Sequence, residues 1–258
     1  MKIAVLIKEV PDTGADRTLN QHTGLADRAA SEAVLDEIGE RTLEVALKIL
    51  DSQPETHITV LSMGPQTIQA TLRKALAMGA AGAIHVSDEQ LLGADLMLTA
   101  QVLAAALRRD QYDLILTGNM STDGSAGMLP VMLAELLSLP AATSLSEITI
   151  TDNVLQGTRE LEGATAQVST PLPAIVSVTE ALPDARFPNF KGIMAAKKKP
   201  IEVLSLADLD VEALPAGTAR SIMLTVNQRP AREAGTIMTD DGQAATALVE
   251  FLAKNNLV

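Results

Sequence analysis

Short apolar segments alternate with longer helical ones over the first 141 residues, and this alternation constrains the fold more than any other feature. The segments with the length and the aliphatic, β-branched character of strands are Ile3–Ile7, His57–Ser62, Ala83–Val86 and Asp113–Thr117. The segments with helical character are Ser31–Leu50, Gln66–Met78, Asp95–Arg109 and Gly124–Leu137. Such alternation is typical of a parallel sheet covered by helices on both faces. The chain is therefore predicted to form an α/β fold with a doubly wound, mainly parallel sheet.

Residues at the ends of these segments support the predicted boundaries. Ser31 suits the N-cap of the first helix, because its hydroxyl can accept a hydrogen bond from a free backbone N–H group. Gly79 suits the end of the second helix, where a left-handed conformation is common. Pro140 closes the alternating region.

A different pattern begins at Ser144. Asp152 and Asn153 predict a hairpin turn, because both residue types tolerate the left-handed conformation of a tight turn. Four further strands are predicted around that turn: Ile148–Thr151, Val154–Arg159, Thr165–Ser169 and Ala174–Val178. They are expected to form either an added β layer or a further pair of strands in the same sheet.

The C-terminal segment, residues 206–258, has a different composition. It contains the Ala- and Pro-rich stretch Glu212–Gly217 and the polar stretch Arg229–Gly235, followed by a predicted helix at Asp241–Lys254. Such a segment cannot build a core of its own, so it is predicted to be an extended arm that packs on the main domain or on a partner subunit. The expected domains are 1–205, an α/β domain that includes a projecting loop at 183–199, and 206–258.

Composition excludes several classes of function. The net charge of −12 argues against nucleic acid as a partner, because phosphate binding depends on Lys and Arg. The chain has no cysteine, and its three histidines show no ligand spacing, so no disulfide frame and no metal site is predicted. No run approaches the ~18 apolar residues of a membrane span, and Met1–Lys8 lacks the features of a signal peptide. A cytoplasmic protein without membrane insertion is expected.

Three loops follow the carboxyl ends of predicted parallel strands, so they are predicted to meet at one edge of the sheet. Open doubly wound sheets bind their ligands at this edge. The first loop is Lys8–Gly14 and the second is Ser62–Pro65. The third loop, Gly118–Gly127, is rich in glycine and small hydroxyl residues and leads into a predicted helix, whose N-terminus would favour a phosphate. Ordinary helix capping would also explain Ser121–Asp123. The predicted ligand-binding residues, on a Rossmann-like nucleotide fold, are Lys8, Glu9, Ser62, Met63, Gly64, Gly118, Asn119, Ser121, Thr122, Asp123, Gly124 and Ser125.

The chain shows no catalytic set in its sequence. There is no Ser–His–Asp pattern, no cysteine nucleophile and no motif that places two carboxylates together. The loops also lack a P-loop or a G-x-G-x-x-G fingerprint. No set of catalytic residues is therefore predicted for this chain.

Two of the three phenylalanines, Phe187 and Phe190, lie three positions apart among polar and turn-forming residues. Apolar rings in such a loop are typical of a protein-docking surface, although both rings could instead fold back as anchors of the loop. Phe187 is the one expected to hold the loop, and Phe190 the one expected to dock. The triplet Lys197–Lys199 is interpreted as a solvated helix end or a contact for an acidic partner.

The region around these rings resembles the electron transfer flavoprotein beta subunit. That family has a "Leu-Pro-Ala-Val" strand, a "Pro-Arg-Tyr" loop and an "Ile-Met-x-Ala-Lys-Lys-Lys" segment. In this chain Leu172–Ile175 lies at the strand, and Ala185 and Phe187 replace the Pro and the Tyr on either side of Arg186. Ile193, Met194, Ala196 and Lys197–Lys199 match the last segment. The resemblance covers most of residues 1–205 and is strongest over 159–201.

The resemblance implies an electron carrier that works with an alpha subunit. In this family the beta subunit holds a structural AMP and closes over an FAD that lies mainly on the alpha subunit. Electrons arrive from dehydrogenases such as acyl-CoA dehydrogenase and pass to an electron-transport acceptor. The flavin performs the electron transfer, so no catalytic residue is expected. The residues implied in partner docking are Arg186, Phe187, Phe190, Ile193 and Met194.

The chain departs from the family pattern at two places near the implied AMP site. Asn119 and Met120 replace a Lys-Gln pair, so side-chain contacts from those positions do not transfer. The stretch Leu35–Ile38 stands where the family has a segment that begins with Asn-Pro, and the Asn-Pro is absent here. Three alternatives stay open: a bifurcating beta subunit with a second FAD and NADH use, a nucleotide-binding stress or regulatory protein of similar fold, and an ATP-using ligase or hydrolase.

Overall fold

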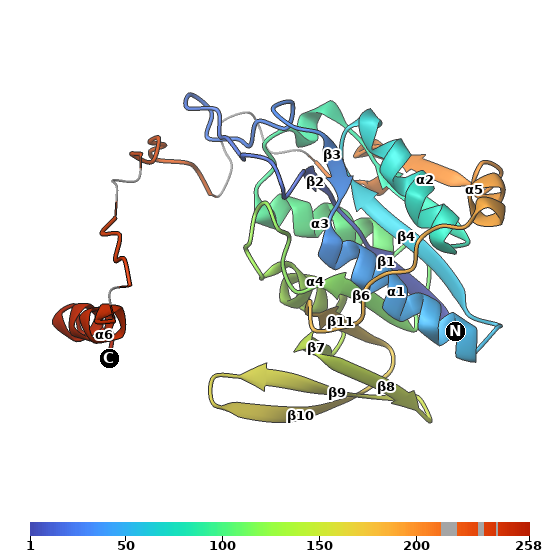
Figure 1. Ribbon diagram of the computed structural model, residues 1–258. Coiled ribbons are helices and arrows are strands. Elements are labelled where there is room, and N and C mark those ends of the chain that lie inside the picture. The colour runs from blue at the N-terminus through green and yellow to red at the C-terminus, as the bar shows by residue number, and fades with distance from the viewer. Residues whose placement is uncertain (213–220, 232–234, 241) are drawn as a thin grey trace. The chain divides into compact units, whose positions relative to one another are not determined.

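The computed structural model describes residues 1–212, 221–231, 235–240 and 242–258 (Figure 1). The chain divides into two compact units, Met1–Leu224 and Thr225–Val258. Most of the predicted Ala- and Pro-rich stretch after Glu212, part of Arg229–Gly235 and the predicted first residue of the last helix, Asp241, lie outside the described residues.

A seven-stranded parallel sheet forms the centre of the first unit, as predicted. Each strand is hydrogen-bonded in parallel to its neighbours, and β1 lies in the middle, with Ile3 opposite both Ile58 and Leu114. In spatial order the strands are β12 (Ile201–Leu204), β5 (Gly82–Val86), β4 (His57–Met63), β1 (Lys2–Leu6), β6 (Leu114–Gly118), β11 (Ala174–Val178) and β7 (Ala141–Leu145). Two of these strands, β7 and β12, were not predicted.

Helices cover both faces of this sheet, because successive side chains of each strand point to opposite faces. Ile3 and Val5 pack with α1 (Glu37–Ser52) and α2 (Gln69–Met78), the latter preceded by the 3₁₀ turn η1 (Gln66–Ile68). Ala4 and Leu6 pack with α3 (Leu96–Leu107) and α4 (Leu129–Leu137) on the other face. Short 3₁₀ turns, η2 (Glu89–Leu91) and η3 (Ala207–Leu209), flank this second layer. Gly79 is the C-cap of α2, as predicted, but its φ of 148° and ψ of −11° lie outside the αL region that the prediction named.

The first predicted helix begins later than expected. Residues Ala33–Leu35 form strand β3, which pairs antiparallel with β2 (Glu9–Pro11), so Ser31 is not a helix cap. The backbone groups of this stretch are satisfied by a partner distant in sequence, which overrides local helix propensity. The helix starts after Asp36, whose backbone N–H donates to Lys8 O.

The fourth predicted helix also begins later, at Leu129 rather than at Gly124. Ser125 and Gly127 have φ values of 50° and 65°, in the left-handed region that interrupts a helix. Pro130 lies in the first turn of α4, where its missing N–H group costs nothing. The loop Gly118–Gly127 therefore leads into α4 as predicted, with Met128 as the N-cap, but the loop residues from Gly124 onward are not helical.

A three-stranded antiparallel sheet forms the added β layer. Asp152 and Asn153 make the predicted turn between the first two strands, with φ values of 49° and 61°. Its strands are β8 (Glu147–Thr151), β9 (Val154–Leu161) and β10 (Ala164–Pro171). The fourth strand predicted in this region, β11, belongs to the central sheet instead.

A short helix, α5 (Phe190–Ala196), lies inside the segment predicted as a projecting loop, and it packs beside α2 (Figure 1). The second unit contains α6 (Ala244–Lys254), close to the predicted position of the last helix.

Candidate functional site

The strand order reverses between β1 and β6. From β1 the chain continues through β4, β5 and β12 on one side, whereas β6 is followed by β11 and β7 on the other. Loops that leave neighbouring strands at such a point separate and open a crevice at the carboxyl edge of the sheet, where doubly wound proteins bind ligands. The loops after β1 and β6 contain the predicted residues Lys8 and Gly118–Ser125.

Lys8 and Asp123 bring these two loops together. The Lys8 ammonium lies 2.6 Å from Asp123 Oδ1 and 3.3 Å from Ser121 Oγ. Arg28 contacts the other carboxylate oxygen at 2.9 Å. The Asp123 side chain is only 6% exposed. Burial alone would raise the pKa of Asp123, but hydrogen bonds from Lys8, Ser121 and Arg28 and the charge of Lys8 hold that pKa well below its ordinary value.

A third cation, Arg17, contacts the same loop. Its guanidinium donates to the carbonyl oxygen and the hydroxyl of Thr122, and to Pro11 O at 2.9 Å. Arg17 and Arg28 were not among the predicted residues. The only signal in the sequence was the presence of isolated arginines in a polar stretch of a strongly acidic chain. Three cationic side chains thus surround one loop at the sheet edge.

The side chain of Asp36 holds the loop after β6 through a hydrogen bond to its backbone. This side chain is almost fully buried, and Oδ2 accepts from Thr122 N at 2.9 Å. Burial raises the pKa of the Asp36 carboxyl, with a smaller contribution in the same direction from the charge of Asp123. Asp36 lies in the Leu35–Ile38 stretch where the family's Asn-Pro is absent, and it links the start of α1 to the loop after β6.

Several backbone amides of this loop donate to groups of the chain itself. Gly124 N donates to Asp123 Oδ1 at 2.7 Å, and Ser125 N donates to Ser121 O at 2.9 Å. Asn119 N donates to Val178 O, and its side-chain oxygen accepts from Met120 N. The N-cap of α4 is Met128, directly after this loop. The cationic side chains Lys8, Arg17 and Arg28 also contact the loop and would add to the attraction for an anion.

The second predicted loop, after β4, has a mainly structural arrangement. The Ser62 hydroxyl is buried and donates to Ile7 O at 2.7 Å, which ties β4 to the end of β1. Gly64 O lies 2.9 Å from Nε2 of the buried His85. Glu9 accepts from the Thr71 hydroxyl on α2. Met63, at the end of β4, is partly buried against the second core layer.

Gly118 is required for packing rather than for a ligand. A Cβ added there would lie 2.7 Å and 2.8 Å from the two γ carbons of Ile38 on α1. By contrast, a Cβ added at Gly124 would lie 3.3 Å from Ser121 Oγ and 3.8 Å from Lys8 Nζ. Gly124 therefore borders the cationic cluster, and a side chain there would occupy space beside the ammonium group.

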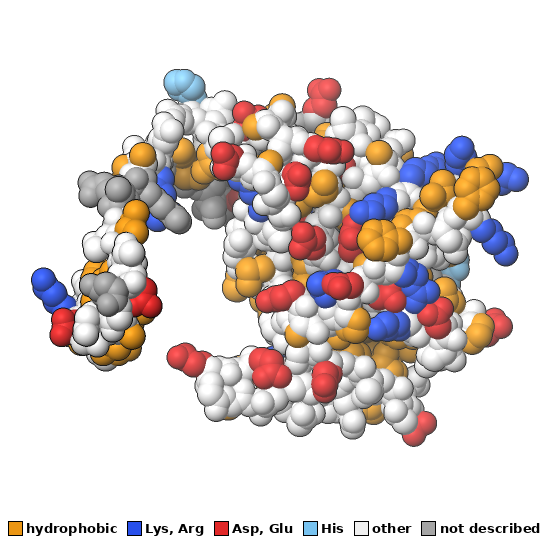
Figure 2. All heavy atoms as spheres, viewed as in Figure 1, with side chains coloured by type: hydrophobic (Ala, Val, Ile, Leu, Met, Phe, Trp, Pro, Cys, Tyr) orange, Lys and Arg blue, Asp and Glu red, His pale blue; other side chains and the backbone are white. Residues whose placement is uncertain are grey.

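The segment 183–199 presents apolar side chains to solvent. Phe187 is 93% exposed and Phe190 is 79% exposed, while Ile193 and Met194 are also exposed. Figure 2 shows hydrophobic side chains next to Lys and Arg side chains over α5. The expectation that Phe187 holds the loop is wrong in this structure, because its ring contacts solvent rather than the domain.

The lysine triplet divides into two exposed residues and one structural residue. Lys197 and Lys198 are exposed. The Lys199 ammonium donates to Leu76 O at 2.8 Å and to Ala80 O at 2.6 Å, at the end of α2, and its partial burial lowers its pKa. The interpretation of the triplet as a wholly solvated helix end is therefore wrong for Lys199, because the carbonyls at the end of α2 take up its charge.

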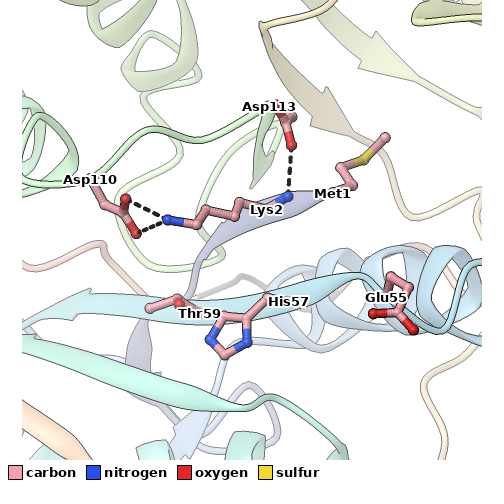
Figure 3. A pocket seen from close by; sticks show the side chains of 7 residues that line it. All are labelled: Met1, Lys2, Glu55, His57, Thr59, Asp110 and Asp113. Atoms are coloured by element: carbon pink, nitrogen blue, oxygen red, sulfur yellow. Dashed lines mark hydrogen bonds and ion pairs between the residues drawn. The ribbon is translucent and has the colours of Figure 1, made fainter.

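A polar hollow lies at the opposite, amino-terminal edge of the sheet (Figure 3). Its charges are paired within the chain: Lys2 Nζ contacts Asp110 at 2.8 Å and 3.0 Å, and Lys2 N donates to Asp113 at 2.7 Å. The hollow is lined by Met1, Lys2, Glu55, His57, Thr59, Asp110 and Asp113. Its place at the amino ends of the strands separates it from the loops described above.

Within the parts of the chain that the structure describes, no group of three His, Cys, Asp or Glu side chains is arranged to hold a metal ion. None of the described helices is both long and apolar enough to cross a membrane.

Comparison with known proteins identifies relatives along the whole chain. A model of the electron transfer flavoprotein domain family matches residues 23–209. The electron transfer flavoprotein subunit beta of Mycobacterium tuberculosis is 41% identical, with 99% of each chain covered. That of Bacillus subtilis is 31% identical, covering 98% of this chain and 97% of the relative. A third relative, the caffeyl-CoA reductase-Etf complex subunit CarD of Acetobacterium woodii, is 30% identical over the full length of both chains.

Proposed function

This chain belongs to the electron transfer flavoprotein beta subunit family and is an electron-transfer carrier subunit, and from that premise we propose that its sheet edge binds AMP. The observation that carries the proposal is the cluster of Lys8, Arg17 and Arg28 around the loop after β6. In a chain with a net charge of −12, three cations at a topological switch point are suited to a phosphate group.

The groups at this edge fit a nucleotide monophosphate. Lys8 and Arg28 are 42% and 49% exposed although both contact the buried Asp123, so their outer N–H groups are accessible to a ligand. Lys8, Arg17 and Arg28 would hold the phosphate, and Asp123 would keep Lys8 and Arg28 oriented toward it. This assignment places AMP recognition in side chains, whereas the sequence had suggested loop amides and a helix N-terminus.

We further propose that the chain pairs with an alpha subunit and closes over an FAD held mainly by that subunit, in the cytoplasm. When bound, the FAD supplies the electron-transfer chemistry, and this chain shields and positions it. The second unit contributes to pairing, because α6 carries exposed apolar side chains at Leu248, Val249 and Phe251 that a partner surface would cover.

The dehydrogenase docks, in this proposal, on the exposed apolar segment that contains Phe187 and Phe190. An acyl-CoA dehydrogenase is the proposed type of partner. Phe190 is the proposed main anchor, because an exposed ring of this size gains most from burial in a partner's pocket. Ile193 and Met194, one turn further along α5, would widen the contact.

Nucleotide extraction from the purified heterodimer tests the cofactor assignment. The chain is co-expressed with its alpha subunit, the complex is denatured, and released nucleotides are identified by mass and quantified. One equivalent each of FAD and AMP is expected, and the complex should be yellow. The chain expressed alone should lack stoichiometric FAD.

Two results would overturn the assignment. A colourless complex at full alpha-subunit occupancy would contradict the flavin role. Two equivalents of FAD without AMP would favour the bifurcating alternative with NADH use. Arg28→Gln should lower the AMP content, whereas Arg109→Gln, which removes an exposed ion pair with Glu202 and a hydrogen bond to Asp208 O, should leave it unchanged.

A further inference from the structure

The segment between β11 and β12 is bonded by charged side chains to α1 at its upstream end and to α2 at its downstream end. At its upstream end, Arg186 Nε lies 2.8 Å from Glu44 Oε2, and Nη2 lies 3.0 Å from Glu44 Oε1. The backbone N–H of Arg186 donates to the same carboxylate at 3.1 Å, and Nη2 also contacts Asp51 at 2.7 Å. This bidentate arrangement fixes both the side chain and the backbone of one loop residue.

Glu44 is the buried member of this arrangement. Its side chain is 7% exposed, whereas those of Arg186 and Asp51 are 36% and 59% exposed. The hydrogen bonds that Arg186 donates to Glu44 and then to Asp51 raise the pKa of Arg186 above its ordinary value, so the guanidinium stays charged. A planar donor group held by a buried carboxylate has little rotational freedom.

Other contacts from the same helix continue the attachment. Arg41 donates to Leu182 O and forms an ion pair with Asp184. Arg41, Glu44 and Asp51 recur at helical spacing on one face of α1, which faces the start of the segment. The segment is thus bonded to α1 on both sides of Pro183.

The downstream end is attached to α2. Arg73 Nη1 donates to Ala196 O at 2.6 Å and to Lys199 O at 2.7 Å. The backbone of α5 approaches so closely at Gly192 that an added Cβ would lie 2.3 Å from Ala77 O. The middle of the segment, with Phe187 and Phe190, is therefore short and held between two fixed ends.

We propose that Glu44 is a positioning residue for partner docking: through Arg186 it holds Phe187 and Phe190 in a projecting arrangement before the partner arrives. The proposal rests on the docking function proposed above. A segment that is already ordered loses less conformational entropy when it binds, so its apolar anchors give higher affinity. Arg186 acts within the chain in this scheme, because its guanidinium is engaged by two carboxylates.

Coupling between Glu44 and Phe190 tests this role. Heterodimers carrying Glu44→Gln, Phe190→Ala or both are assayed as electron acceptors for a purified, substrate-reduced acyl-CoA dehydrogenase. Phe190→Ala is expected to raise the apparent KM for the heterodimer about tenfold. Glu44→Gln is expected to raise it about fivefold with kcat unchanged, since the anchor is present but less ordered. In the double variant the two effects should combine to less than their product, because Glu44→Gln can then act only through Phe187.

Matched controls separate positioning from general loss of stability. Glu202 lies on β12, and Glu202→Gln removes its exposed ion pair with Arg109. This control should leave unchanged both the KM and the size of the Phe190→Ala effect. Flavin content and urea unfolding establish that each heterodimer is folded. If Glu44→Gln does not fold, Asp51→Asn, which removes only the outer partner of Arg186, is combined with Phe190→Ala in the same way, with an expected KM increase of about twofold.

The outcomes distinguish this inference from the docking function beneath it. An unchanged KM for Phe190→Ala would overturn docking through that ring. A raised KM for Phe190→Ala with no effect of Glu44→Gln would leave docking intact and overturn the positioning role. Independent, multiplicative effects of the two substitutions would also overturn it, because Glu44 would then act other than through the presentation of Phe190.

Discussion

At the carboxyl edge of the sheet and in the segment 183–199, a buried carboxylate pairs with a cation, but the first surface exposes charged side chains and the second exposes apolar ones. Each has a buried carboxylate that holds arginine or lysine: Asp123 is 6% exposed and Glu44 is 7% exposed. At the sheet edge the cations themselves remain accessible, with Lys8 and Arg28 nearly half exposed. At the segment the cation serves as an attachment, and the accessible groups are Phe187 and Phe190.

This difference shows how an ion pair can determine the kind of ligand a surface takes. A buried carboxylate orients its partner in both places, but what reaches solvent depends on which residues follow the ion pair in the chain. Small and polar residues follow Asp123, so the cations dominate that surface. Phenylalanine follows Arg186, so an apolar surface results. The first suits an anion, and the second suits a protein pocket.

The largest expected effect comes from adding one methyl group in each region. Gly192→Ala should lower the free energy of unfolding by about 2–3 kcal/mol, because the new Cβ would lie 2.3 Å from Ala77 O and α5 must move away from α2. Gly124→Ala should cost less than about 1 kcal/mol, since its nearest neighbour would be the Ser121 hydroxyl at 3.3 Å. Urea unfolding of both variants measures the difference, and equal costs would contradict the comparison.

Removing the lysine at the sheet edge should have the next largest effect. Lys8→Met should reduce the AMP content and lower the free energy of unfolding by about 1–2 kcal/mol, because Asp123 keeps only Arg28 as its counter-charge. Lys2→Met is the matched control: its ion pair with Asp110 is about half exposed, so a smaller loss of stability is expected. Nucleotide extraction and thermal unfolding test both; retained AMP in Lys8→Met would argue for a site elsewhere.

Acid should weaken both regions in the same direction. The pKa values of Asp123 and Asp51 lie below the ordinary value of 3.8, so each carboxylate contributes stability that is complete above the unfolded pKa. That contribution is lost as pH falls below about 4 toward the folded pKa. Melting temperatures measured from pH 6 to pH 3 should fall less steeply in Asp51→Asn than in the unchanged chain. An identical slope would show that Asp51 contributes nothing to the attachment of Arg186.

The smallest expected effect is that of Phe187→Ala on stability. Because 93% of the Phe187 surface is exposed, Phe187→Ala should change the free energy of unfolding by less than about 0.5 kcal/mol. Urea unfolding measures this. A loss of unfolding free energy above about 1 kcal/mol would mean that the ring packs on the domain. The segment 183–199 would then not be an exposed apolar surface, in contrast to the comparison above.

The sequence by itself determined the central architecture and the edge at which the loops meet. The strand and helix periods of residues such as Ile3–Ile7 and Gln66–Met78 are local properties, and the rule that ligands bind at strand carboxyl ends places Lys8 and Asp123 at one edge. The aromatic pair at Phe187 and Phe190 was likewise visible as an apolar feature in a polar loop. The strands β7 and β12 were not predicted, because β7 consists of small and hydroxyl residues apart from Leu145, and β12 has only four residues.

Only the tertiary structure decided which charged residues pair with one another at the sheet edge and at the segment 183–199. Arg28 reaches Asp123 across 95 positions of sequence, and Arg186 reaches Glu44 across 142. Lys199 likewise bonds the end of α2 from 119 positions away. No local pattern encodes such pairings, since a long charged side chain can adopt many directions until packing of the helices and strands leaves one. Burial then decides the role of each charge, because a carboxylate removed from water must be paired.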